Sequence, residues 1–73
     1  MSALNDYVDQ ANKLRSIFGQ KIWDVKNSAH RAEIKERLEC DLSPENLTCD
    51  GELSMAEVRR RSKLFTKALA EIS

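Results

Sequence analysis

The feature that most constrains the fold is a stripe of apolar residues at helical spacing, running from residue 4 to residue 32. On a helical projection of about 100° per residue, these side chains fall on one continuous line: Leu4, Tyr7, Val8, Ala11, Leu14, Phe18, Ile22, Val25, Ala29 and Ala32. The sequence shows no alternation of apolar and polar residues typical of strands. The pattern therefore predicts an all-α chain that begins with a long amphipathic helix over residues 3–39.

Gly19 lies inside this predicted helix. A glycine in a helix interior is less favourable than an alanine by about 1 kcal/mol. We therefore expect either a kink at Gly19 or a break into two helices, with the apolar stripe continuing across it.

A second substantial helix is predicted over residues 54–72, after a capped loop over residues 40–53. Ser54 and Glu57 have the spacing of a capping box, which marks the start of a helix. The apolar face of this helix should pack antiparallel against the first stripe, and it contains Val58, Phe65, Ala68, Leu69 and Ile72. The expected architecture is a helical hairpin or a small three-helix bundle.

Inside the loop, Ser43 and Pro44 predict a single helical turn, because proline is favoured at the first position of a helix. Asp50 and Gly51 predict a turn. The loop does not match a calcium-binding loop, since Asn46 stands where that motif requires glycine.

His30 is the only histidine, which excludes a site with several histidine ligands. The sequence contains no glycine-rich phosphate loop, and a chain of this size hardly encloses a catalytic pocket. We therefore expect no enzymatic activity, no bound metal and no cofactor.

A second apolar line appears after residue 22 and consists of Trp23, Ile34 and Leu38, with Asn27 and His30 between them. It lies well over 100° from the first stripe on the same projection. A helix with two apolar faces needs two surfaces to pack against, so we expect a partner or a second copy of the chain, in a homodimer, to cover this line. For Trp23 an intramolecular core position is an equally open interpretation, and for His30 half-buried packing is the alternative.

Charge is segregated along a chain whose net charge is zero. Residues 41–57 carry five acidic side chains and no basic one, whereas residues 58–73 carry five basic and one acidic. A basic face is expected on the last helix, formed by Arg59, Arg60, Lys63 and Lys67. It could be a solvated face, contact an acidic protein, or contact phosphates.

At 73 residues the chain has room for one domain, and a core of this size rarely supplies more than about 3–5 kcal/mol. Cys40 and Cys49 do not have the spacing of a redox or zinc motif. We expect free thiols in a cytoplasmic protein, with a disulfide as the open alternative. The sequence shows no secretory signal and no apolar run long enough to cross a membrane.

Taken together, these features predict a small non-enzymatic protein-protein interaction module. It would be a regulator, adaptor or inhibitor of a larger protein, a type common among phage and mobile-element products. It would act sterically through the apolar line that includes Trp23 and through the basic face. The alternative hypothesis is a dimeric nucleic-acid-binding protein that uses the basic C-terminal helix. The absence of a net positive charge and of interleaved aromatic residues argues against that alternative.

Overall fold

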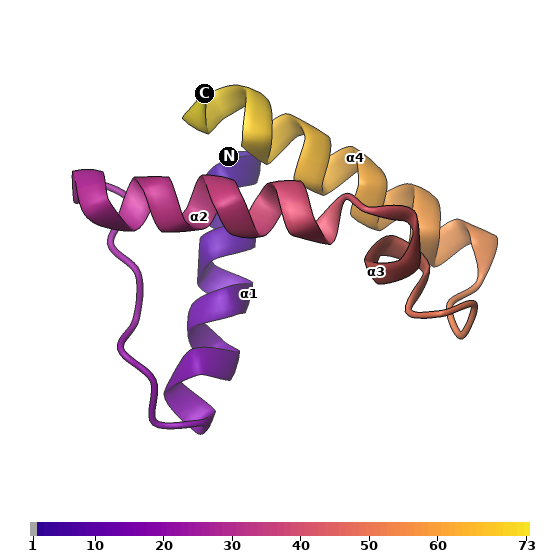
Figure 1. Ribbon diagram of the computed structural model, residues 1–73, viewed down its shortest axis with the longest axis horizontal. Coiled ribbons are helices and arrows are strands. Elements are labelled where there is room, and N and C mark those ends of the chain that lie inside the picture. Colours follow the sequence, from indigo (N-terminus) through magenta and orange to yellow (C-terminus); the bar gives the residue numbers. More distant parts are fainter. Residues whose placement is uncertain (1) are drawn as a thin grey trace.

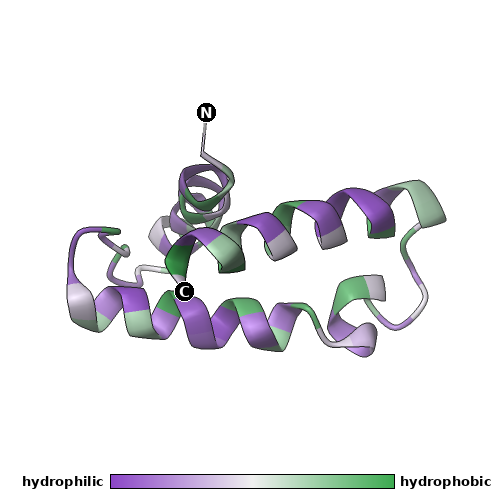
Figure 2. Cartoon of the chain, turned by 90° about the horizontal axis from the view of Figure 1, so that it is seen from above, coloured by the Kyte–Doolittle hydropathy of each residue, from purple (hydrophilic) through white to green (hydrophobic). Residues whose placement is uncertain are grey.

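The computed structural model describes residues 2–73, which form an all-α structure, as predicted. Its helices are α1 (Ala3–Ile17), α2 (Ser28–Asp41), α3 (Pro44–Thr48) and α4 (Met55–Ile72). Helices α2 and α4 lie side by side and run in opposite directions, and α1 crosses them (Figures 1 and 2). Helix α4 contacts each of the other three helices, so it forms the centre of the small bundle.

The predicted long helix is broken at residues 18–27, so the second of the two alternatives for Gly19 is the correct one. Gly19 has a φ of 70°. Its N–H donates to the carbonyl of Ser16 at 3.1 Å, and the N–H of Gln20 donates to the carbonyl of Arg15 at 2.7 Å. This pair of hydrogen bonds is the Schellman motif, which ends a helix at a residue in the left-handed region.

Replacing Gly19 by alanine should lower the free energy of unfolding by about 1 kcal/mol, because the left-handed region is unfavourable for residues that carry a Cβ. A Cβ at this position would meet no atom within 4 Å, so no clash adds to the cost. Urea unfolding measures the change. The control is Lys21→Ala at an exposed position of the same linker, which should shift the free energy by less than about 0.5 kcal/mol. Equal stability of the two variants would contradict the left-handed geometry.

The predicted helix starts after residue 42 are confirmed. Helix α3 begins with Pro44 at its first position. Helix α4 begins at Met55, where the Ser54 hydroxyl accepts the N–H of Glu57 at 3.3 Å. The other half of the capping box is not formed, and the Glu57 carboxylate instead pairs with Arg60 at 3.2 Å.

The core lies between α1, α2 and α4, and its buried residues are Leu4, Tyr7, Val8, Trp23, Ile34, Leu38, Phe65, Ala68 and Ile72. Ile34 and Leu38 have exposed fractions of 0%. The prediction that a partner or a second copy covers these two side chains is wrong, since the chain itself buries them. The break after α1 allows α2 to turn this face towards the other helices, which a continuous helix could not do.

The end of the first apolar stripe is exposed, contrary to the expected packing of Phe18 and Ile22 against the last helix. The exposed fractions are 59% for Leu14, 74% for Phe18 and 54% for Ile22. Only the N-terminal part of α1 crosses the α2 and α4 pair, and its C-terminal part extends away from them (Figure 1). The apolar side chains at that end therefore lie outside the core and stay largely exposed.

Glu71 ties the two ends of the chain together. Its carboxylate accepts the Ser2 hydroxyl at 2.6 Å and the N–H of Leu4 at 3.0 Å. These hydrogen bonds lower the pKa of Glu71, the Ser2 bond most strongly. A carboxylate at the N-terminus of α1 also interacts favourably with the helix dipole.

Candidate functional site

The structure places the predicted site residues in different environments. Trp23 lies in the linker between α1 and α2, and His30 is half-buried on α2. The buried positions of Ile34 and Leu38 remove them from any surface. The remaining predicted residues form the basic face and are all exposed on α4, namely Arg59, Arg60, Lys63 and Lys67.

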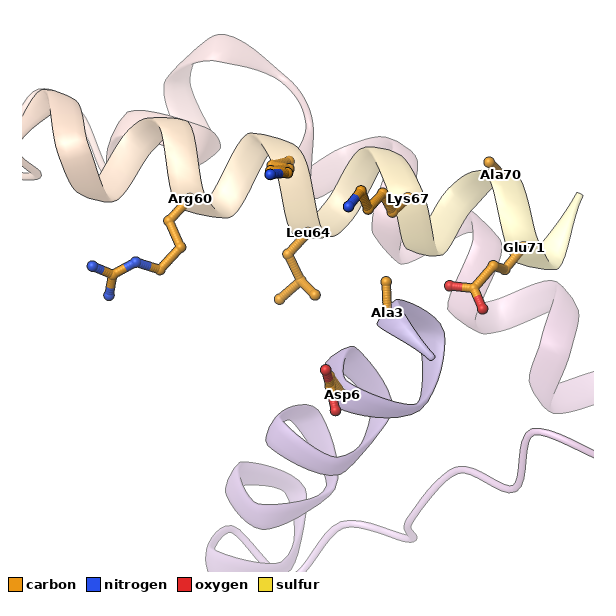
Figure 3. A pocket seen from close by; sticks show the side chains of 8 residues that line it. Ala3, Asp6, Arg60, Leu64, Lys67, Ala70 and Glu71 are labelled. Atoms are coloured by element: carbon orange, nitrogen blue, oxygen red, sulfur yellow. The ribbon is translucent and has the colours of Figure 1, made fainter. Parts of the chain in front are cut away.

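The basic face is open to solvent and mostly unpaired. Within the part of the chain that the structure describes, Arg60 pairs with Glu57, and the other three members of the face form no ion pair. Beside it lies a hollow of about 590 Å³ between α4 and the start of α1. Figure 3 shows Arg60 and Leu64 extending into this space from α4, with Ala3 and Asp6 on the α1 side.

A second hollow, also of about 590 Å³, lies between α1, the linker, the end of α2 and the middle of α4. We call it the aromatic groove. It is lined by Tyr7, Gln10, Ala11, Leu14, Arg15, Phe18, Gln20, Trp23, Arg37, Asp41, Arg61 and Phe65. The groove thus combines four aromatic rings with three arginines.

The floor of the groove consists of buried rings. Tyr7 and Phe65 meet edge to face, with ring centroids 5.3 Å apart. The Trp23 indole N–H donates to the Glu33 carboxylate at 3.1 Å. The Asn12 side chain also bonds both the backbone N–H and the carbonyl of Trp23, at 2.8 and 3.0 Å. These contacts hold the rings in fixed positions.

Two of the arginines lie against the rings of the floor. The Arg15 guanidinium is 4.5 Å from the Trp23 ring centroid, and its Nε donates to a linker carbonyl at 2.8 Å. The Arg61 guanidinium is 5.1 Å from the Phe65 ring and donates to two α3 carbonyls at 3.2 and 3.3 Å. Cation-π contacts of this kind orient the guanidinium groups.

Asp41 is the single carboxylate among the residues that line the groove. It accepts the Tyr7 hydroxyl at 2.8 Å and pairs with the Arg37 Nε at 3.2 Å. Burial, and then the hydrogen bond to Asp41, raise the pKa of Tyr7 well above its ordinary value. Because Arg37 pairs with this carboxylate, Arg15 and Arg61 have no carboxylate partner among the residues that line the groove.

His30 holds the linker in place. Its Nδ1 accepts the backbone N–H of Asp24 at 2.9 Å. Nearby, the Arg31 guanidinium donates to the carbonyl of Val25 at 3.0 Å. His30 therefore positions the linker relative to α2.

The thiols and the side chains that could ligate a metal form no cluster in the described residues. Cys40 and Cys49 are exposed and form no disulfide. Within residues 2–73, no group of three or more His, Cys, Asp and Glu side chains could hold a metal ion.

Reasoning from the sequence missed two sets of surface residues. The first is the apolar tip, made of exposed side chains at the end of α1 and in the linker: Leu14, Ile17, Phe18 and Ile22. The second is the arginines of the groove: Arg15, Arg37 and Arg61. Gly19 could have indicated the first set, because a helix that breaks at this residue no longer presents the apolar stripe on one continuous face.

Comparison with known proteins assigns no family to the chain. No family model matches it, and neither does any curated protein or solved structure. In the described part of the chain, no helix combines the length and hydropathy needed to cross a membrane. The surfaces themselves therefore carry the evidence for function.

Proposed function

We propose that the chain is a small non-enzymatic protein-protein interaction module that regulates, recruits or inhibits a larger protein by occupying its surface. The observation that supports this function is the apolar tip. Phe18 and Ile17 are 74% and 75% exposed, side by side in the sequence at the end of α1. Clustered apolar side chains in water are typical of interaction surfaces.

The tip adjoins the aromatic groove, because Leu14 and Phe18 belong to both. Tryptophan, tyrosine and arginine are enriched among the residues that dominate binding energy. In this groove they are held by hydrogen bonds and ring contacts, so little side-chain freedom is lost on binding. A preorganised floor beside an exposed apolar rim suits a steric binding mechanism.

The homodimer was predicted because it would cover the apolar line that includes Ile34 and Leu38, but the chain itself covers both side chains. It remains a prediction, and the solution mass of the purified protein tests it. A monomeric mass leaves the apolar tip free for a different protein.

Replacing Phe18 by aspartate should reduce capture of the protein partner by more than about tenfold, because an anchor side chain typically contributes 2 kcal/mol or more. The measurement is affinity capture from a lysate of the source cell, read by mass spectrometry. The matched control is Ser16→Asp, which adds the same charge at an exposed position of the last turn of α1 outside the groove lining. Equal capture by the two variants would contradict the proposed function.

The second candidate is nucleic-acid binding through the basic face, favoured by the exposure of Lys63 and Lys67 one helical turn apart on α4. The same capture, repeated after nuclease treatment, separates the candidates. Loss of all bound material after digestion, together with loss in a Lys63→Glu, Lys67→Glu variant, would favour nucleic acid.

A further inference from the structure

We infer that the aromatic groove binds an acidic segment of the partner protein in which carboxylates lie next to apolar side chains. This inference rests on the proposed function and specifies the chemistry of the partner. It concerns the groove and not the basic face of α4.

The charge of the groove supports an acidic occupant. Three guanidinium groups line it against the single carboxylate of Asp41, which Arg37 already pairs. Within residues 2–73, neither Arg15 nor Arg61 pairs with a carboxylate. Partner carboxylates would therefore complement two guanidinium groups that form no ion pair within the described residues.

The two arginines also keep unused hydrogen-bond donors. Arg15 uses only its Nε in a bond to the protein, and Arg61 uses Nε and one terminal nitrogen. The other N–H groups have no protein acceptor in the described chain. A guanidinium can bind a carboxylate through two parallel hydrogen bonds, and here its position is already fixed by a ring and a carbonyl.

The apolar part of the occupant follows from the rim and the floor. Leu14 and Phe18 stand exposed at the rim and offer the apolar contact, whereas the rings of Tyr7, Trp23 and Phe65 at the floor are almost fully buried within the chain. A hollow of about 590 Å³ is within the usual range for ligand sites. The hollow is large enough to bury a few apolar side chains of a peptide. A purely ionic ligand would leave this space unfilled.

A nucleic-acid strand fits this groove less well. Stacked bases could use the rings, but phosphates would lie beside the exposed aliphatic side chains of the apolar tip without burying them. A protein segment with mixed acidic and apolar side chains matches both properties at once.

Selection from a random peptide display library on the immobilised wild-type protein tests this inference. We expect enriched peptides to carry Asp or Glu next to Leu, Phe, Tyr or Trp. Trp23 is the only tryptophan and lies in the groove, so its fluorescence reports binding of a tryptophan-free selected peptide. A matched peptide with Asn and Gln in place of Asp and Glu should bind at least about tenfold more weakly.

The arginines are tested on the protein side with an Arg15→Gln, Arg61→Gln variant, which should weaken the selected peptide by about tenfold. The control variant Lys63→Gln, Lys67→Gln loses the same charge on the basic face and should change affinity by less than about twofold. Circular dichroism checks that the helices are retained. If the arginine variant unfolds, the comparison of the acidic and amide peptides on the wild-type protein still tests the inference.

Several results would overturn the inference. They are the absence of any enriched peptide, enrichment of basic peptides, equal binding of the acidic and amide peptides, and a change in Trp23 fluorescence with oligothymidylate but not with peptides. If peptides bind equally with and without carboxylates but lose affinity in Phe18→Asp, the inference fails and the proposed function stands. If, in addition, Phe18→Asp leaves lysate capture unchanged, both fail.

Discussion

Replacing Leu38 by alanine is expected to leave much of the chain unfolded in the absence of denaturant. The Leu38 side chain has an exposed fraction of 0% in the core between α1, α2 and α4. Truncating a buried leucine costs about 2–5 kcal/mol, and a core of this size rarely supplies more than about 3–5 kcal/mol. Far-ultraviolet circular dichroism, followed through urea unfolding, measures both the residual helix and the loss of stability.

The control is Leu14→Ala, the same chemical change at a position that is 59% exposed. It should lower the free energy of unfolding by less than about 1 kcal/mol, since little apolar area leaves a packed environment. A Leu38→Ala protein that stays as stable as Leu14→Ala would contradict the structure. That result would support the prediction from the sequence, in which Leu38 lies on a surface that a partner covers.

The local features of this fold could be predicted from the sequence because each depends on a few adjacent residues. Pro44 begins α3, Ser54 caps α4, and Gly19 ends α1. Helical periodicity also predicted the all-α class, since the amphipathic pattern extends over several turns.

The partition of apolar residues between core and surface could not be predicted in the same way. A projection assumes one straight helix, and the break at residues 18–27 changes which faces point inward. Ile34 and Leu38 were therefore expected at the surface but lie in the core. Phe18 and Ile22 were expected in the core but are exposed.

The aromatic groove depends on tertiary structure to a still greater degree. Its walls come from α1, the linker, α2 and α4, and they meet only because α1 crosses the other two long helices. Arg15 and Arg61 are far apart in the sequence, and neither belongs to a motif. Trp23 was identified from its residue type and its place on the second apolar line, but the arginine stacked on it could be found only in three dimensions.

Raising the pH above about 10 should destabilise the protein through Tyr7. Burial and the hydrogen bond to Asp41 raise the pKa of Tyr7, and the weaker influence of Arg37 acts in the opposite direction. Above the ordinary tyrosine pKa, the unfolded chain loses this proton while the folded chain keeps it, so stability falls as pH rises. The loss approaches about 1.4 kcal/mol per pH unit until the folded-state pKa is reached.

Tyr7 is the only tyrosine, so tyrosinate absorbance reports its ionisation without overlap from another residue. In the folded protein this absorbance should appear only as the helices unfold. The Tyr7→Phe variant measures how much of the pH dependence comes from groups other than Tyr7. That variant should lose about 1–3 kcal/mol at neutral pH, because the half-buried Asp41 carboxylate loses a hydrogen-bond donor. It should also show a shallower decline above pH about 10. Reversible ionisation of Tyr7 near its ordinary pKa, with the helices intact, would mean that the bond to Asp41 is not formed.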